Sequence, residues 1–184
     1  IPYIYFEDIS TDFKFLEIIL ADGMNSILYK KLRLELGLIY SISVDFNLDE
    51  TDKSLSYLSI NTQIEQKNII TYLDNLLIIL KRIVHNPINN QELDYVKKNI
   101  NVSMLEEKLQ NDPEDFISKY GKYVLWNQPI INFKQNYYLL NKVTNKTLKQ
   151  ACQKAFVKDK MTIGYSCQNN YNQKIKRLID KFEF

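Results

Sequence analysis

Two polar side chains, Arg33 and Tyr40, lie close together in one compact stretch of the sequence, DGMNSILYKKLRLELGLIYSIS at residues 22–43. A guanidinium and a phenol hydroxyl are both hydrogen-bond donors. Gly37 lies between them, and a glycine at such a position can end a helix by taking the left-handed conformation. Arg33 is therefore expected in the last turns of a helix and Tyr40 in the strand that follows, so that both side chains can face one cleft.

Ordinary structural roles for the same two residues stay open at this level. Arg33 could pair with a surface carboxylate such as Glu35 or Glu50. Tyr40 could be a core tyrosine with only its hydroxyl at the rim, because it shares its alternation face with three apolar residues. These residues are Leu38, Ile42 and Val44.

The chain has one histidine, His85, and this limits its metal chemistry. His85 lies at a predicted helix end, beside Asn86 and Pro87, where an imidazole complements the helix dipole. Neither HExxH nor HxxEH occurs, so a zinc site with two histidines is excluded and no cofactor is expected on this chain. GxSxG, P-loop and GxGxxG motifs are also absent, which removes the usual signals of serine hydrolysis, nucleotide hydrolysis and hydride transfer.

Carboxylates are the remaining candidates for acid-base chemistry. Glu106 with Glu107, or Asp112 with Glu114 and Asp115, lie close enough in sequence to pair. Runs of this kind at helix starts and on helix faces are more typical of solvated or capping groups. The chain on its own therefore looks catalytically incomplete, and we expect no enzyme activity from it alone.

Composition is that of a globular protein, and the length fits a single domain covering residues 1–184. The 24 basic and 22 acidic residues leave a formal net charge of +2, without a polybasic stripe that would indicate nucleic acid. The longest apolar run, LDNLLIIL at 73–80, is too short to span a membrane. The sequence begins IPYIYFEDIS without an initiator methionine, so we expect a fragment of a longer protein.

The two cysteines, Cys152 and Cys167, have neither CxxC spacing nor a histidine cluster beside them. Both are predicted to be small buried side chains. Two unpatterned cysteines favour a reducing intracellular compartment over secretion, although a single disulfide between them stays open.

The sequence pattern of the first part of the chain predicts a strand followed by two helices. Residues 2–7 are aromatic and β-branched, as in a strand. Helical spacing then runs from a predicted N-cap at Asp12 to about residue 21. A second helix is expected from a cap at Asn25 or Ser26 to Gly37.

A hairpin and a core helix are predicted next. Residues 38–46 and 54–64 read as antiparallel strands, and the alternation slips near Tyr57 and Leu58, where we expect a bulge or burial on both faces. The period becomes helical from residue 68 to 84.

In the rest of the chain, the sequence pattern predicts mainly helices. Asn89 and Glu92 resemble a capping box that opens one helix, and Thr144 is expected to cap another. The remaining predicted elements are helices at 112–126, 133–141 and 173–182 and a strand at 161–167. This order lacks the regular alternation of a parallel α/β sheet, so it favours an α+β fold with a mostly antiparallel sheet of about four strands packed against several helices.

The segment ADGMNSILYKKLRLELGLIYSIS, residues 21–43, resembles the corresponding segment of the insulinase, pitrilysin and mitochondrial processing peptidase superfamily of zinc metallopeptidases. There, a Gly-Met-polar-Ser run opens a helix that carries an arginine before a Gly-Leu-any-Tyr-Ser turn. INNQELDYVKKNI at 88–100 is similar to the family's helix that begins with a Glu-Leu pair, and KVTNKTLKQACQKAF at 142–156 is similar to its threonine-capped helix. One departure is Leu34, because the family often has an acidic residue there and this chain has its acid at Glu35.

The resemblance covers nearly the whole chain and implies the metal-free C-terminal domain of a peptidase half, with a LuxS-like, processing-peptidase-like fold. It implies a peptide substrate and a catalytic domain or subunit that bears HxxEH and holds zinc. In peptidase members, an arginine and a tyrosine with six residues between them reach the substrate near the zinc. Arg33 and Tyr40 match that spacing, so the resemblance gives them roles in holding the peptide backbone and stabilising charge on the attacked carbonyl.

Two further functions stay open. The same family includes core proteins of respiratory complexes that have lost peptidase chemistry, so the chain could belong to a structural or assembly subunit. It could also be a stand-alone peptide-binding module.

Overall fold

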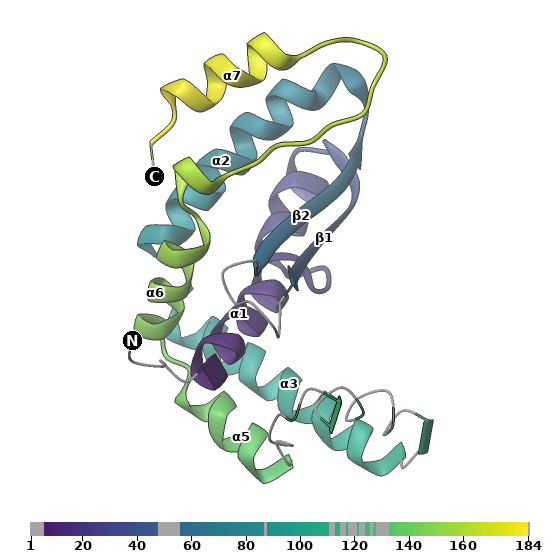
Figure 1. The fold of residues 1–184 in the computed structure, drawn as a ribbon, viewed down its shortest axis with the longest axis vertical. Helices are drawn as coiled ribbons and strands as arrows, with labels where there is room; N and C mark the ends of the chain where they lie inside the picture. Colours follow the sequence, from purple (N-terminus) through teal and green to yellow (C-terminus); the bar gives the residue numbers. More distant parts are fainter. Residues whose placement is uncertain are drawn as a thin grey trace.

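A computed structural model gives the fold of the chain (Figure 1). It describes residues 6–47, 56–86, 88–110, 113–114, 117, 121, 124–125, 127 and 133–183. These residues form an α+β fold made of one two-stranded antiparallel hairpin and a set of helices. The elements are α1 (Phe6–Ala21), η1 (Tyr29–Glu35), β1 (Ile39–Asn47), β2 (Tyr57–Ile64), η3 (Gln66–Asn68), α2 (Ile69–His85), α3 (Asn90–Gln110), α5 (Phe133–Lys142), α6 (Asn145–Ala155), η4 (Lys158–Lys160) and α7 (Asn172–Lys181).

The first helix begins earlier than the sequence pattern predicts. α1 starts at Phe6, so the end of the strand predicted at 2–7 is helical, and the rest of it lies outside the described residues. Asp12 is inside the helix, and its prediction as the N-cap is therefore wrong. Its Oδ1 instead accepts a hydrogen bond from Thr147 Oγ1 at 2.8 Å, which ties α1 to α6. The predicted end near residue 21 is confirmed.

The predicted hairpin is confirmed, but its irregularity lies on the other strand. β1 and β2 pair antiparallel, and Tyr57 and Leu58 keep a regular register opposite Asn47 and Phe46. The bulge expected at Tyr57 and Leu58 is therefore wrong. The register shifts instead within β1, between Ile39 and Ile42.

The strand predicted at 161–167 is also wrong. This segment is extended but joins no ladder, and Figure 1 shows it as the long connection between η4 and α7. Alternation and β-propensity describe an extended chain, whereas a strand also needs a neighbour for its backbone groups. Within the described part of the chain the sheet has two strands, so the expected four-stranded sheet is not formed.

Helix boundaries were predicted best where side chains cap the helix. Asn89 and Glu92 exchange two hydrogen bonds of 2.9 Å at the start of α3, as expected for a capping box. Thr144 caps α6 and forms a similar reciprocal pair with Thr147. The described residues between 113 and 125 are helical, whereas Asp112, Asp115 and Trp126 lie outside the described part.

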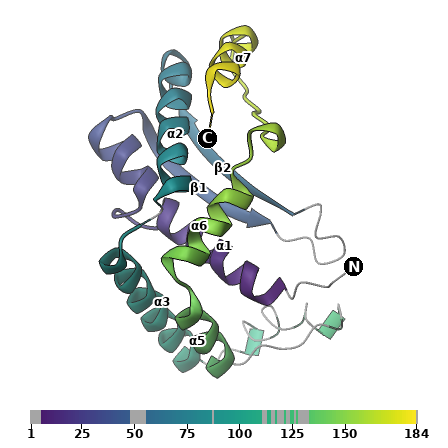
Figure 2. The same ribbon diagram turned by 90° about the vertical axis from the view of Figure 1, so that its left-hand side faces the viewer.

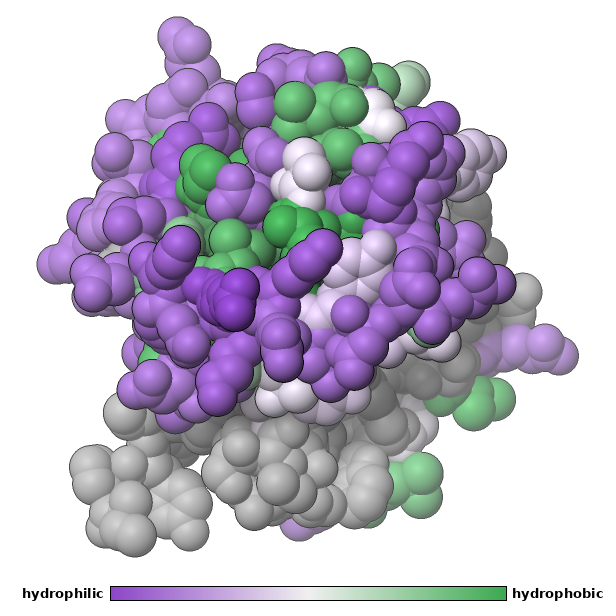
Figure 3. All heavy atoms as spheres, turned by 90° about the horizontal axis from the view of Figure 1, so that it is seen from above, coloured by the Kyte–Doolittle hydropathy of each residue, from purple (hydrophilic) through white to green (hydrophobic). Residues whose placement is uncertain are grey.

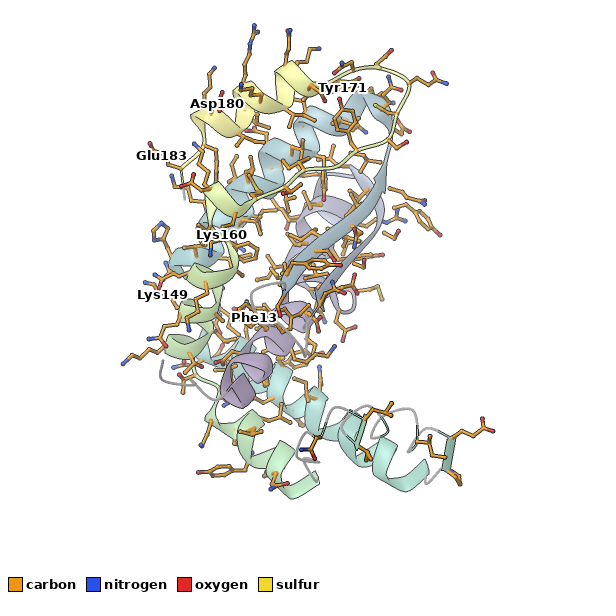
Figure 4. All side chains as sticks on the ribbon, in the orientation of Figure 1. Phe13, Lys149, Lys160, Tyr171, Asp180 and Glu183 are labelled. Carbon is orange, nitrogen blue, oxygen red and sulfur yellow. The ribbon has the colours of Figure 1, made fainter. Side chains whose placement is uncertain are left out.

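One hydrophobic core joins the helices to the hairpin. α1 packs against β1 and α6, and α6 also contacts α2, an arrangement that Figure 2 shows from the side on which α6 lies across α1. Phe13 of α1, labelled in Figure 4, stacks on Phe46 of β1 with ring centroids 4.5 Å apart. The hairpin is thus fixed against α1, and η1, which contacts β1, is fixed with it.

The C-terminal helix covers one end of this core. Seen from above, that end shows apolar side chains in the middle of a mostly hydrophilic face (Figure 3). Ile175 is the buried residue of α7, and Leu178 and Ile179 pack partly against the core. None of the helices that the structure describes is both long enough and apolar enough to cross a membrane.

Candidate functional site

Arg33 lies on η1, a π-helical segment that the core holds in place. Leu28 and Leu32 are fully buried, and they fix the inner face of this segment. The amide of Leu36 donates to the carbonyl of Lys31 at 3.2 Å, which is the wider hydrogen-bond spacing of a π-helix. Arg33 itself is half-buried, so its guanidinium starts from a rigid base and extends toward the surface.

Gly37 reverses the chain after η1, as the sequence predicts. Its φ is +61°, in the left-handed region that glycine reaches without steric cost. Two hydrogen bonds close the turn, from the Gly37 amide to the Arg33 carbonyl at 3.2 Å and from the Leu38 amide to the Leu32 carbonyl at 2.9 Å. The turn therefore begins at the backbone of Arg33 and leads directly into β1.

A bulge at the start of β1 turns Tyr40 outward. Ile39 pairs with Ile64 and Ile42 pairs with Thr62, so two residues of β1 oppose a single residue of β2. A bulge of this kind shifts the alternation of side chains by one position. Ile39 is consequently buried, and the Tyr40 side chain is 75% exposed. The core-tyrosine alternative is therefore wrong.

The structure brings Arg33 and Tyr40 into contact. The Arg33 guanidinium carbon lies 4.5 Å from the centre of the Tyr40 ring, within the range of a cation–π interaction. One nitrogen of the same guanidinium donates to the Ile39 carbonyl at 3.0 Å. The charge is thus held over an exposed ring by the backbone next to that ring.

Of the surface carboxylates expected as partners of Arg33, Glu35 is engaged elsewhere. Glu35 binds Lys31 instead, with Nζ and Oε2 2.6 Å apart. This hydrogen bond to Lys31 is the main reason that the pKa of Glu35 is lowered. Glu50 lies outside the described residues.

Among the other candidates, those whose side chains the structure describes do not gather into a site. His85 is exposed at the end of α2, Glu114 is exposed, and the side chains of Glu106 and Glu107 lie outside the description. Where the structure describes the chain, it holds no group of three or more His, Cys, Asp or Glu that could bind a metal ion.

The cysteines differ from each other. Cys152 is buried, as predicted for a small core side chain. Burial raises the pKa of its thiol to about 12. Cys167 is free and exposed, so its predicted burial is wrong.

Two polar contacts around β1 were not predicted from the sequence. Glu17 of α1 accepts a hydrogen bond from the Phe46 amide, and Thr62 of β2 donates to the Ser41 carbonyl. Each joins residues more than 20 positions apart in sequence, and no local motif signals such a pairing. Glu17 also lines a hollow of about 890 Å³ between α1, β1 and α3, whose lining residues include neither Arg33 nor Tyr40.

A family model for the peptidase M16 inactive domain matches residues 7–100, which run from α1 into α3 and include η1, Gly37 and the hairpin. The chain belongs to this family. The predicted membership in the C-terminal, non-catalytic domain group of this zinc metallopeptidase family is confirmed.

Solved structures show that the M16 inactive-domain fold extends beyond the matched segment. A peptidase M16 inactive domain from Pseudomonas fluorescens has a TM-score of 0.68 at 18% identity, over 80% of this chain and 34% of that chain. A protease from Helicobacter pylori has a TM-score of 0.59 at 15% identity, over 84% of this chain and 36% of that one. A candidate zinc protease from Bordetella pertussis Tohama I has a TM-score of 0.58 at 15% identity, over 79% of this chain and 77% of that one.

The M16 inactive domain described here thus spans about a third of the length of the first solved proteins that it resembles. No curated protein matches it by sequence.

Proposed function

We propose that this M16 inactive domain is the substrate-binding, non-catalytic part of a zinc-dependent metalloendopeptidase, and that it completes a peptide-binding chamber when joined to a catalytic domain or subunit that bears HxxEH. Family membership supports the non-catalytic role. The greater length of the solved proteins that share its fold supports the joining to a further part. Zinc is assigned to the catalytic part, because the described donors of this chain do not fit a metal site.

The observation that carries the proposal is the exposed pair of Arg33 and Tyr40. Core tyrosines bury their rings, whereas the Tyr40 side chain is 75% exposed and stacks against a cation. A guanidinium has several N–H donors, and the bond to Ile39 engages one nitrogen. The pair therefore presents a positive charge and a hydroxyl donor on one rigid surface.

Peptide hydrolysis gives such a surface a specific role. The attacked carbonyl gains negative charge in the transition state, and fixed donors near that oxygen stabilise it. In the proposed complex, Tyr40 donates its hydroxyl to the peptide carbonyl while Arg33 supplies the positive potential. Because η1, Gly37 and the bulge are already ordered, neither donor has to be rearranged when the peptide binds.

The test compares variants of the full-length protein that keep the fold. Tyr40→Phe keeps the ring and removes the hydroxyl, and Arg33→Ala removes the charge. Each is expected to lower kcat/KM for peptide cleavage about a hundredfold, as for a lost transition-state donor of about 3 kcal/mol. Each should change the free energy of unfolding by no more than about 1 kcal/mol.

The matched control is Tyr57→Phe, because Tyr57 is also an exposed tyrosine of the hairpin and lies at its other end. This variant should cleave peptides at the wild-type rate. Wild-type cleavage by both Arg33→Ala and Tyr40→Phe would overturn the substrate-binding proposal and favour a structural or assembly subunit. Peptide binding by this chain without any partner would favour the stand-alone module.

A further inference from the structure

The bulge that exposes Tyr40 is held by a residue of the opposite strand. Thr62 Oγ1 donates a hydrogen bond to the Ser41 carbonyl at 2.6 Å. Thr62 lies opposite Ile42, at the first regular pair after the bulge, and its side chain is half-buried. The bond therefore crosses the hairpin where its ladder is interrupted.

The extra residue of a bulge disrupts the backbone pairing around it, and side-chain donors can bond the carbonyls that the ladder leaves unpaired. At this bulge, side chains donate to two backbone carbonyls. Arg33 donates to the Ile39 carbonyl and Thr62 donates to the Ser41 carbonyl. Tyr40 lies between these two anchored carbonyls, so the direction of its side chain depends on both.

Loss of the bulge would reverse the position of Tyr40. Side chains alternate along a strand, and a shift of one residue moves each of them to the other face. Without the extra residue, Tyr40 would share the face of Ile42 and Val44, which pack toward the core. If the bulge were only partly loosened, the Tyr40 side chain would adopt several orientations, and its ring would no longer stay stacked on the Arg33 guanidinium.

We propose that Thr62 is a positioning residue, whose hydroxyl fixes the bulge of β1 and thereby holds Tyr40 and the stacked Arg33 in the orientation that meets the substrate. The inference rests on the proposed function of that pair. Thr62 acts through Tyr40 and Arg33 and has no contact with the substrate in this proposal.

The experiment uses three variants of the full-length protein. Thr62→Val keeps the branched shape and removes the donor, whereas Thr62→Ser keeps the hydroxyl. Ser59→Ala is the matched control, because Ser59 Oγ also donates across the hairpin, to the Asp45 carbonyl at 3.4 Å, but in the regular part of the ladder. Peptide cleavage and amide hydrogen exchange of the segment 38–46 are measured for each variant.

Thr62→Val is expected to lower kcat/KM about tenfold, since a misplaced binding group reduces the rate without being a reacting group itself. It should also speed hydrogen exchange in the segment 38–46, with exchange in α2 unchanged. Thr62→Ser should restore both properties, and Ser59→Ala should cleave as the wild type does. Wild-type cleavage and exchange in Thr62→Val would overturn the inference.

A second background separates this inference from the proposed function. In a protein that carries both Arg33→Ala and Tyr40→Ala, Thr62→Val should cause no further loss of cleavage, because both groups that it positions are gone. An equal tenfold loss in that background would overturn the positioning role. Wild-type cleavage by the protein with both Arg33→Ala and Tyr40→Ala would overturn the proposed function, and the exchange measurement would still decide whether Thr62 holds the bulge.

Discussion

The guanidinium carbon of Arg33 lies 4.5 Å from the centre of the Tyr40 ring, although one residue belongs to a helix and the other to a strand. A left-handed glycine lies between them along the chain, and Tyr40 itself lies in the bulge of β1. The pair is therefore a product of local backbone geometry, and its stability contribution can be separated from its functional contribution.

The first prediction is that this contact adds little to stability. An exposed cation–π pair contributes about 0.5–1 kcal/mol. A double-mutant cycle of Arg33→Ala and Tyr40→Ala, followed by denaturant unfolding, should give a coupling energy in this range. Tyr40→Phe keeps a ring for the cation, so the Tyr40→Phe protein should retain most of the interaction energy between this ring and Arg33. A coupling energy of several kcal/mol would mean that the pair is kept for folding.

The orientation of Tyr40 shows where sequence reasoning stops. Strict alternation from Ile42 and Val44 places Tyr40 on the core face, and the sequence carries no glycine or other signal of a bulge at that point. Around the bulge, the Ser41 carbonyl accepts a hydrogen bond from Thr62 on the other strand, and the Ile39 carbonyl accepts one from Arg33. The helical segment of Arg33, the turn at Gly37 and the strand of Tyr40 were predictable from local patterns. Which face of the strand Tyr40 lies on was not.

Contacts between distant segments explain the other differences. Asp12 has the residue type of an N-cap, yet its hydrogen-bond partner is Thr147, 135 residues away. The segment 161–167 has strand propensity but no neighbouring strand among the described residues. The capping boxes at Asn89 and Thr144 were predictable because both of their members lie within one turn of the same helix.

A second prediction concerns the glycines with positive φ, which are Gly37 at +61° and Gly23 at +75°. A Cβ added at either position meets no atom within 4 Å, so alanine would cost only backbone strain, about 1–2 kcal/mol. Gly37→Ala and Gly23→Ala should therefore lower the free energy of unfolding by similar amounts. Cleavage by the full-length protein should fall only in Gly37→Ala, because that turn connects Arg33 to Tyr40. Equal effects of both variants on cleavage would contradict a local role for Gly37.

A third prediction concerns the edge of β1 next to α1. Glu17 accepts from the Phe46 amide and forms an ion pair of 2.6 Å with Lys14, and the two side chains are 11% and 71% exposed. Glu17→Ala leaves a backbone amide without its acceptor, which costs about 1–3 kcal/mol. Lys14→Ala removes only the exposed partner and should cost less than about 1 kcal/mol. Urea unfolding of both variants measures the difference, and equal costs would show that the ion pair matters more than the amide contact.

A fourth prediction is that the two thiols react at very different rates. Thiolates are the reactive species, and burial raises the pKa of the Cys152 thiol to about 12. Cys167 is exposed. A thiol reagent at pH 8 should therefore modify Cys167 in the folded protein and Cys152 only after unfolding. Cys167→Ser should abolish the fast reaction, and a fast reaction that persists in this variant would show that Cys152 is accessible.

The last prediction concerns stability at alkaline pH. Tyr72 of α2 is 5% exposed, and burial raises the pKa of its phenol from 10.0 to about 12. Below pH 10 the phenol is protonated in both the folded and the unfolded state, so its titration leaves the free energy of unfolding unchanged. Between pH 10 and pH 12 the unfolded state releases the proton and the folded state keeps it. Rising pH therefore favours unfolding, by up to about 1.4 kcal/mol per pH unit.

The comparison that isolates this effect is Tyr72→Phe against the wild type, with urea unfolding at pH 8 and at pH 11. The wild type should lose stability between these values, and Tyr72→Phe should lose about 1 kcal/mol less, because its ring cannot ionise. Cys152 acts in the same direction from pH 9, so some loss should remain in the variant. Tyr137→Phe, at an exposed position, should lose as much as the wild type. If Tyr72→Phe and Tyr137→Phe lose equal stability, the Tyr72 phenol does not resist ionisation in the folded state.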